Sequence, residues 1–182
     1  MPELVLPTMA VHRSFLAGMA EFVEEGRGVS DDDSMIAREM RNFGPAWETE
    51  EGFSAYIEQL LAEADESTAR ASFMVPSTTW WWVDGAQYLG RIALRHRLTL
   101  RLLEIGGHIG YDVRPSARRQ GHATAMLRAV LPYAHALGID PALVTCDTDN
   151  VGSRKVIEAN GGVLEDERSG KLRWWVPTGV GG

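Results

Sequence analysis

The chain has 182 residues, of which 45% are hydrophobic and 24% charged, and its formal net charge at pH 7 is −7. This length suits one domain with a sizeable core, and no apolar run approaches the roughly 18 residues that a membrane span requires. The acidic balance disfavours nucleic-acid binding, which needs a basic surface, and the composition leaves enzymes and small-ligand binding modules open.

The first half of the chain is predicted to form one edge strand followed by helices. Pro7 restricts a strand over residues 2–9 to an edge or an end of a sheet. Apolar residues at helical spacing indicate helices over residues 11–25 and from Thr49 to about residue 64. Between them, Asp31 to Ser34 offer N-caps for a short helix that ends near residue 40.

After residue 76 the hydrophobic period changes, and strands alternate with helices. Residues 77–83 (STTWWWV) are rich in aromatic residues and threonine, and Asp84-Gly85 predicts a hairpin to residues 87–96. Residues 98–105 fit either a short helix or a strand. The remaining elements are strands over 108–113 and 142–147, helices over 117–136 and 153–159, and a hairpin over 163–167 and 171–176. This order predicts a mixed α/β domain with one right-handed crossover.

The most informative segment, RPSARRQGHATAMLRA over residues 114–129, joins a predicted strand to a predicted helix. In it, Arg118, Gly121 and Ala123 form an R-x-x-G-x-A pattern at the start of the helix. The helix N-terminus gathers N–H groups and partial positive charge, and glycine lets a ligand approach the backbone. The segment therefore predicts a pyrophosphate site, although so short a motif also fits a plain basic loop that opens a helix.

Two neighbouring segments extend this pattern. The strand HIGYDVRP over residues 108–115 precedes the loop, and a second strand–helix unit with Asn150 and Ser153 follows it and ends at Asn160-Gly161-Gly162. Together they resemble the GNAT superfamily of acetyl-CoA-dependent N-acetyltransferases. The resemblance implies a mixed, mostly antiparallel twisted sheet flanked by helices, with splayed fourth and fifth strands. It also implies a single domain over residues 1–182, with an acyl-CoA-binding core at 77–176 and a helical acceptor side at 1–70.

The resemblance implies acetyl-CoA as the cosubstrate and assigns residues to it. The main chain of Tyr111, Asp112 and Val113 would pair with the amides of the pantetheine arm. Asn150 and Ser153 would line the same arm, and Asn150 can serve as a helix N-cap at the same time. The pyrophosphate would lie on Arg118, Arg119, Gln120, Gly121, His122, Ala123 and Thr124.

One position departs from the family pattern. Many members carry a tyrosine seven residues after the asparagine, as the acid that protonates the leaving thiolate, and here that position is Ile157. Ser153, Tyr111, Cys146 and a water are the alternatives. A coenzyme A thiolate, with a thiol pKa of roughly 8.5 by analogy with cysteine, also leaves without much assistance.

The attacking amine needs a base, because a pKa near about 10.4 keeps it protonated at neutral pH. His108 starts the strand on which related sequences often place a glutamate, and the ordinary pKa of histidine suits this task. A strand-end histidine bonded to a neighbour or to solvent is the alternative. Glu104, Asp147 and Ser153 complete the candidate catalytic residues, although Asp147 also fits a pairing with Arg114.

Cys146 is not expected to be a nucleophile, and the remaining histidines are not expected to bind a metal. Cys146 lies inside a predicted strand with no histidine close in sequence, which favours a buried inert thiol. The histidines show no metal-ligand spacing, so we expect no metal.

Along a strand, Trp81 would face one side of the sheet, and Trp80 and Trp82 the other. One side is expected in the core, and the other would line an acceptor pocket or a dimer surface.

Charge divides the chain into an acidic and a basic half. Residues 1–90 carry 16 acidic and 5 basic side chains, a net charge of −11, whereas residues 91–182 carry 9 and 13, a net charge of +4. We therefore expect an anionic coenzyme on one side and a small cationic amine as the acceptor on the other. Acidic and basic side chains on two faces that contact only solvent would give the same charge counts. The acids that would attract the amine are Glu24, Glu25, Asp31, Asp32, Asp33, Glu50 and Glu51.

Three other functions remain open. A non-catalytic acyl-CoA-binding module is favoured by the missing tyrosine, and an acetyltransferase of protein or peptide N-termini differs only in its acceptor. A different phosphate-binding α/β protein is disfavoured, because the loop lacks both the Lys-Ser/Thr of a P-loop and the triple glycine of a dinucleotide fold. We expect a cytoplasmic protein without a membrane or nucleic-acid partner, and the tryptophans leave a homodimer open.

Overall fold

The computed structural model describes residues 1–179, and its centre is a seven-stranded sheet with the order β1-β2-β3-β4-β5-β7-β6. All neighbouring strands are antiparallel except β4 and β5, which are parallel. The sheet is therefore mixed and mostly antiparallel, as predicted. The strands are β1 (Glu3–Val5), β2 (Ser77–Asp84), β3 (Gln87–Arg95), β4 (Ile109–Val113), β5 (Ala142–Asp147), β6 (Val163–Arg168) and β7 (Lys171–Val176).

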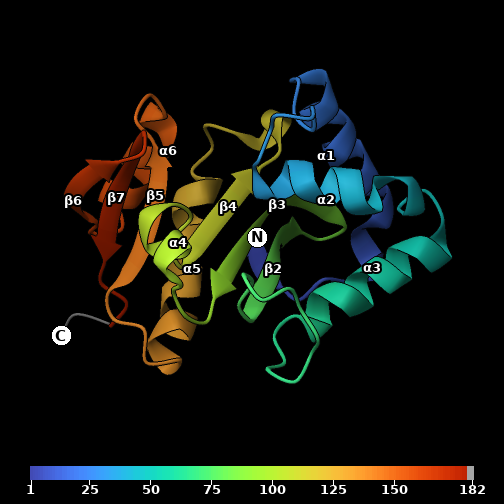
Figure 1. Cartoon of the computed structure of the whole chain (residues 1–182). Coiled ribbons are helices and arrows are strands. Elements are labelled where there is room, and N and C mark those ends of the chain that lie inside the picture. The colour runs from blue at the N-terminus through green and yellow to red at the C-terminus, as the bar shows by residue number, and fades with distance from the viewer. Residues whose placement is uncertain (180–182) are drawn as a thin grey trace.

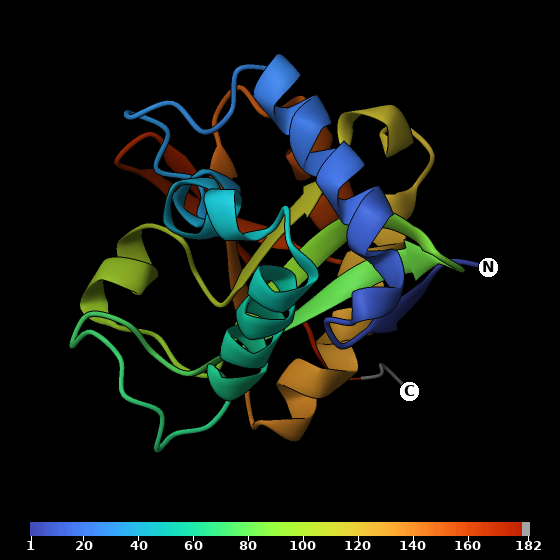
Figure 2. The same cartoon turned by 90° about the vertical axis from the view of Figure 1, so that its right-hand side faces the viewer.

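Helices cover both faces of the sheet (Figure 1). One apolar cluster packs α5 and α6 against one face, and a second packs α1 and α3 against the other, where Figure 2 shows them in front of the strands. The helices are α1 (His12–Glu24), α2 (Met35–Phe43), α3 (Glu50–Ala62), α4 (Leu100–Glu104), α5 (His122–Ala136) and α6 (Val151–Glu158). Three 3-10 turns join them: η1 (Met9–Val11), η2 (Gly44–Ala46) and η3 (Pro115–Ala117).

The tryptophans of β2 divide between the two clusters. Trp81 is fully buried on the α1 side, with its ring centroid 5.3 Å from that of Phe15. Trp80 and Trp82 are 8% and 6% exposed on the α5 side. The predicted alternation is correct, but neither face of β2 forms an exposed aromatic surface, because helices cover both.

Side-chain caps account for several helix starts. At α3, the Thr49 hydroxyl oxygen accepts a hydrogen bond from Gly52 N at 3.0 Å. At α4, the Thr99 hydroxyl accepts from Leu102 N at 3.2 Å. This cap satisfies an otherwise unpaired N–H group, and residues 100–104 form a helix where the sequence pattern alone was ambiguous.

The helix predicted from residue 117 begins later than expected, at His122. The preceding residues form η3 and then a loop in which Arg119 has a φ of 62° and Gly121 a φ of 83°. These left-handed conformations interrupt the helical hydrogen-bond pattern. Because α5 begins at His122 rather than at residue 117, an open loop lies between β4 and α5, and it contains the predicted pyrophosphate motif.

A buried ionic contact fastens α2 to β3 and α3. Glu39 on α2 pairs with Arg91 on β3 and accepts a hydrogen bond from the Tyr56 hydroxyl on α3. Arg91 is only 1% exposed, and burial raises the pKa of Tyr56. Removing one partner would leave a buried charge without compensation, so the contact fixes α2 over β3 and β4.

Two properties of residues 1–179 bear on the function. None of the helices within residues 1–179 is both long and apolar enough to cross a bilayer. In the same part of the chain, no three histidine, cysteine, aspartate or glutamate side chains are grouped as metal ligands.

Candidate active site

The loop that follows β4 presents an open helix N-terminus. Gly121 is the N-cap of α5, and no side chain caps this helix. The first N–H groups of a helix without a cap are free to bind an anion, and the helix dipole favours negative charge there. Nothing lies within 4 Å of a Cβ added at Gly121, so the backbone is accessible at this point. The loop therefore fits a pyrophosphate group.

The strands β4 and β5 meet at one end only. They share a single register pair, Ile109 with Val144. Just before that pair, His108 N donates to Leu143 O at 2.8 Å, and Leu143 N donates to His108 Nδ1 at 2.9 Å. Beyond Ile109 no further pairing joins the two strands among the described residues, so they diverge toward the open loop.

Backbone groups of β4 face this gap. Arg114 N donates to Leu89 O at 3.0 Å, on the β3 side. Alternate residues of a strand direct their backbone groups to opposite sides, so those of Tyr111 and Val113 point toward β5. One of them, Val113 O, accepts a hydrogen bond from Arg118 Nε at 3.0 Å. The gap thus offers an extended backbone edge to a ligand with amide groups.

Two hydroxyl groups meet across the gap on the α5 face. Tyr111 Oη lies 2.6 Å from Ser153 Oγ in the first turn of α6. Asn150 holds that turn, because its side-chain oxygen accepts from Ser153 N at 3.0 Å. Burial raises the pKa of Tyr111, so this group keeps its proton at neutral pH. Ile157 is fully buried in the apolar core, which excludes a catalytic group at that position.

His108, the first candidate base, occupies a structural position. It is 7% exposed, and its Nδ1 is already an acceptor for Leu143 N. Burial, reinforced by Arg95, lowers the pKa of His108 to about 4. A base for an ammonium group needs a pKa closer to 7 and a free nitrogen, so the geometry disfavours His108 in that role.

The two acidic candidates lie in exposed ion pairs. Glu104 Oε1 is 2.8 Å from Arg168 Nη1, and Asp147 pairs with Lys171. Asp147 does not contact Arg114, which instead pairs with Glu21 on α1. These pairings neutralise both carboxylates at the surface and give no support to either one as the base.

The loop residues have distinct surroundings. Arg118 forms a two-pronged pair with Glu25, the residue after α1, with Nη2 2.8 Å from Oε2. Gln120 Nε2 donates to Ser116 O at 3.3 Å, and His122 Nδ1 accepts from Trp82 Nε1 at 3.2 Å. Arg118 is therefore already paired with a carboxylate of the same chain, and the sequence motif gave no sign of this pairing.

Asp112 is the functional candidate that sequence reasoning missed, because only its main chain was assigned. Its side chain lies on the α2 face of β4, opposite Arg91 of β3, and is 15% exposed. Its one described partner is Arg27, whose Nη2 donates to Oδ1 at 3.4 Å. Burial raises the pKa of Asp112, which shifts this carboxyl toward the range of a general base. The alternation of side chains along the strand was the signal that could have found it.

The state of His108 gives the first testable prediction. Its pKa is lower in the folded chain than the ordinary value of 6.5, so it stabilises the fold above pH 6.5, and that contribution is lost as the pH falls toward 4. In His108→Gln, an amide oxygen can accept from Leu143 N without titrating. We expect urea unfolding to show about 1–3 kcal/mol less acid destabilisation between pH 7 and 4.5 in this variant.

The control variant is His135→Gln, because the His135 side chain is exposed. The pKa of His96 is also lowered by burial, but His96 is present in every protein compared. If His108→Gln and wild type lost the same stability over this pH range, the buried, neutral state of His108 would be contradicted.

Comparisons with known proteins identify the family. The acetyltransferase (GNAT) domain family matches residues 27–163, and the search of curated proteins gave no match. RimJ of Mycobacterium smegmatis, solved in complex with a CoA disulfide, has 16% identity and a TM-score of 0.66, with 97% of this chain and 81% of that chain covered. The microcin C7 self-immunity acetyltransferase MccE, solved with acetyl-CoA and AMP, has 12% identity and a TM-score of 0.61, covering 97% and 92%.

A third structure, the ribosomal-protein-S5-alanine acetyltransferase of Vibrio fischeri, has 15% identity and a TM-score of 0.60, covering 96% and 90%. These similarities show a shared fold. The family match extends over more than half of the chain and includes β4, the loop, α5, β5 and α6. The chain therefore belongs to the GNAT acetyltransferase family.

Proposed function

We propose that this acetyltransferase transfers the acetyl group of acetyl-CoA to a cationic primary amine by direct attack within a ternary complex. The observation that carries the proposal is the gap between β4 and β5, which joins an unpaired backbone edge to an uncapped helix N-terminus. Few ligands combine a chain of amides with a pyrophosphate group, and coenzyme A does. When bound, acetyl-CoA supplies the reactive thioester.

The residues present fit that group. The N-terminus of α5 at Gly121 accepts the pyrophosphate, and the backbone edge at Tyr111 and Val113 accepts the amides of the pantetheine arm. Asn150 and Ser153 form the opposite wall, as the first turn of α6. In this arrangement the thioester would lie beside the Tyr111–Ser153 hydroxyl pair.

The two hydroxyl groups supply the acid that Ile157 cannot provide. In the proposed reaction the amine nitrogen forms a bond to the acetyl carbonyl carbon, and the carbon–sulfur bond breaks. The sulfur takes a proton from the Ser153 hydroxyl, which regains one from Tyr111 through their 2.6 Å contact. The Tyr111 phenolate then takes up a proton from solvent. A thiolate needs only modest assistance, so a weak acid at short distance suffices.

The acceptor approaches from the opposite face, where Asp112 lies. Tyr111 and Asp112 are successive residues of β4, so their side chains point to opposite faces of the sheet. The ammonium group loses one proton to the Asp112 carboxylate before it attacks, and the second proton, lost as the C–N bond forms, leaves to solvent. Most of the surrounding layer comes from residues 1–90, whose net charge is −11, and we expect this charge to attract a protonated amine.

Coenzyme binding is tested by thermal unfolding with and without acetyl-CoA. A ligand at about 100 times its Kd stabilises a protein by roughly 2.7 kcal/mol, which is about 5–10 °C in Tm for a chain of this length. We expect such a shift in wild type and its loss in Gly121→Glu, because a carboxylate would then oppose the pyrophosphate.

The matched control is Gly85→Glu in the β2–β3 hairpin. Gly85 has a φ of 57° and Gly121 a φ of 83°, and neither has an atom within 4 Å of an added Cβ. Both variants therefore carry a similar backbone strain. The proposed site would be contradicted if millimolar acetyl-CoA did not raise the Tm of wild type, or if Gly121→Glu kept the full rise in Tm.

The Arg118–Glu25 pair gives a second prediction about the coenzyme. A bound pyrophosphate must share or displace the carboxylate that already holds Arg118. We expect Glu25→Gln to tighten acetyl-CoA binding about threefold to tenfold in calorimetric titrations, because a competing charge is removed. The neighbouring Glu24→Gln is the control. Weaker binding in Glu25→Gln would instead show that the pair positions Arg118 for its ligand.

The role of Asp112 is tested with Asp112→Asn. We expect kcat to fall by about a hundredfold or more, the usual contribution of a general base, while the thermal shift with acetyl-CoA is retained. In wild type, kcat/KM should rise with pH through the raised pKa of Asp112, and this limb should disappear in the variant.

Asp32→Asn is the control, because Asp32 also contacts Arg27, with Oδ2 3.1 Å from Nε. If both substitutions lowered the rate equally, Asp112 would act only through Arg27. Binding of acetyl-CoA without turnover of any amine would favour a non-catalytic module.

A further inference from the structure

The first residue of α5 is hydrogen-bonded to a tryptophan of the sheet. Trp82 Nε1 donates to His122 Nδ1 at 3.2 Å, across 40 residues of the chain. Trp82 is buried in the apolar cluster between the sheet and α5, where an indole N–H group needs a partner inside the protein. The imidazole provides that partner, so the half-buried ring of His122 is held against the sheet.

This hydrogen bond fixes the tautomer of the His122 ring. The indole nitrogen of a tryptophan can only donate, so His122 Nδ1 must be the ring nitrogen that carries no proton. An imidazolium ion, with protons on both nitrogens, would offer Trp82 no acceptor. While the contact holds, His122 is therefore the neutral tautomer with its proton on Nε2, and the outer end of the ring is a hydrogen-bond donor.

The Nε2–H group is available to a ligand at the start of α5. The two ring nitrogens direct their hydrogen bonds away from each other, so a ring whose Nδ1 faces Trp82 turns Nε2 away from the core. Among the hydrogen bonds of residues 1–179, the imidazole takes part only in the one from Trp82. His122 also directly follows Gly121, the N-cap of α5 that no side chain caps. The free donor therefore adjoins the unpaired N–H groups of the first helical turn.

The arginines of the same loop are less well prepared to bind an anion. Arg118 is paired with Glu25 and must exchange that carboxylate for a ligand. Arg119 is exposed, and a ligand must order its long side chain, which costs conformational entropy. The His122 ring is already oriented by Trp82 and has no internal acceptor to leave. A donor that is fixed before binding loses little freedom on binding, so its hydrogen bond contributes more fully to affinity.

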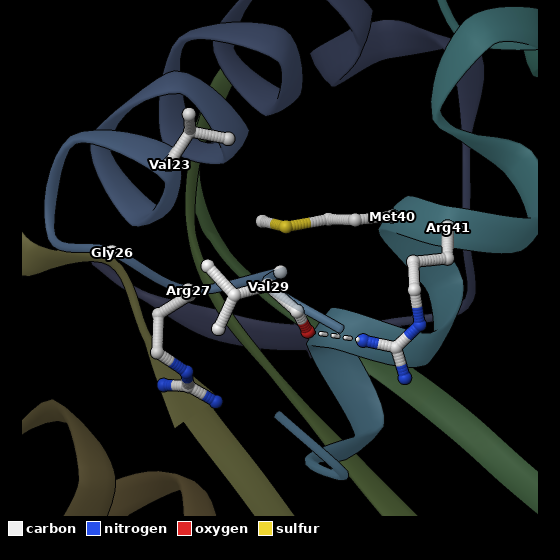
Figure 3. A pocket seen from close by; sticks show the side chains of 7 residues that line it. Val23, Gly26, Arg27, Val29, Met40 and Arg41 are labelled. Atoms are coloured by element: carbon white, nitrogen blue, oxygen red, sulfur yellow. Dashed lines mark hydrogen bonds between the residues drawn. The ribbon is translucent and has the colours of Figure 1, made fainter. Parts of the chain in front are cut away.

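A third arginine near this loop belongs to the α1–α2 connection. The guanidinium carbons of Arg27 and Arg118 lie 5.7 and 5.9 Å from the centroid of the Phe22 ring. Arg27 Nε is 3.1 Å from Asp32 Oδ2, and its side chain lines a hollow of about 330 Å³ between α1 and α2 (Figure 3). No residue of α5 or of the loop before it lines that hollow. Arg27 is thus engaged elsewhere, which leaves His122 as an oriented and unpaired donor at the loop.

We propose that His122 Nε2 donates a hydrogen bond to a phosphate oxygen of the bound coenzyme, and that Trp82 is the positioning residue that keeps the proton on that nitrogen. This inference rests on the proposed function. It adds one side-chain contact, and a residue of β2, to a site that the loop motif builds from backbone N–H groups and arginine. A hydrogen bond to an ionised acceptor is about twice as strong as one between neutral groups, so a single imidazole contributes measurably.

The tautomer is tested by nitrogen NMR of the full chain labelled at histidine, with His122→Asn to assign the signals. The protonated and unprotonated nitrogens of a neutral imidazole resonate far apart, which identifies the tautomer directly. We expect His122 to carry its proton on Nε2 at neutral pH, and both acetyl-CoA and inorganic pyrophosphate to move the Nε2 signal. A proton on Nδ1, or an Nε2 signal that acetyl-CoA leaves unchanged, would overturn the proposal.

Two substitutions of His122 separate ligand binding from support of Trp82. Asparagine places an acceptor where Nδ1 lies, so His122→Asn keeps the bond from Trp82 but has no group at the position of Nε2. Glutamine reaches that position with an N–H donor. By calorimetry we expect acetyl-CoA to bind about tenfold more weakly to His122→Asn and within about threefold of wild type to His122→Gln. Wild-type affinity in His122→Asn would reduce His122 to a structural partner of Trp82 and exclude the proposed contact.

Trp82→Phe tests the positioning role, because it removes the N–H group and keeps an aromatic ring in the core. We expect a mixture of His122 tautomers and acetyl-CoA binding weakened by about threefold or more, with no further loss when His122→Asn is added. Trp80→Phe is the matched control, since Trp80 is buried on the same face of β2. Equal weakening by the two phenylalanines would show a packing effect and contradict the role of Trp82.

Turnover assays keep this inference distinct from the proposed function. S-acetylpantetheine carries the same thioester without a pyrophosphate, so His122→Asn should lower kcat/KM with acetyl-CoA about tenfold more than kcat/KM with S-acetylpantetheine. An equal fall with both donors would overturn the phosphate contact. Binding of acetyl-CoA with the expected NMR signals, but without turnover of any amine, would count against the amine transfer alone. Failure of wild type to bind acetyl-CoA would overturn both.

Discussion

The geometry of the candidate site depends on one joint between two parallel strands. At this joint His108 supplies both a backbone N–H group to Leu143 O and a ring nitrogen to Leu143 N. A side chain thus replaces a backbone partner just before the Ile109–Val144 pair, at the closed end of the gap. Gly107 permits the close approach, because a Cβ there would lie 2.5 Å from Leu143 O. The pairing is therefore firmly held at the closed end, and β4 and β5 diverge on the other side of the Ile109–Val144 pair, where the backbone edge at Tyr111 and Val113 is left to a ligand.

The separated strands make a site with two chemically different faces. On the α5 side, Tyr111 and Ser153 form a neutral hydroxyl pair whose proton is retained because the phenol is buried. On the α2 side, Asp112 lies in a charged layer with Arg27, above the buried pair of Glu39 and Arg91. A proton donor on one face and an acceptor on the other suit a reaction in which one proton is lost from the amine and another is gained by the sulfur.

Much of the fold could be predicted because its signals are local. The cap at Thr49, the bounds of β5 and the turn at Asp84-Gly85 follow from side-chain hydrogen bonds, periodicity and turn chemistry within a few residues. The R-x-x-G-x-A loop, for which the sequence predicts a pyrophosphate site, is a local signal of the same kind. The start of α5 was misjudged, because the helical periodicity continues into a loop whose left-handed residues break the hydrogen-bond pattern.

The sequence by itself therefore determined most of the element order, the family resemblance and the position of the glycine-containing loop between β4 and α5. The tertiary structure decided the states of the charged groups, since these depend on partners that are distant in the chain. His108 is neutralised by burial against a strand 35 residues away, and Arg118 is held by a carboxylate 93 residues away. Asp112 becomes a candidate base only because α2 and its flanking loop remove it from water. Desolvation and charge pairing are properties of the packed molecule, and a linear pattern does not contain them.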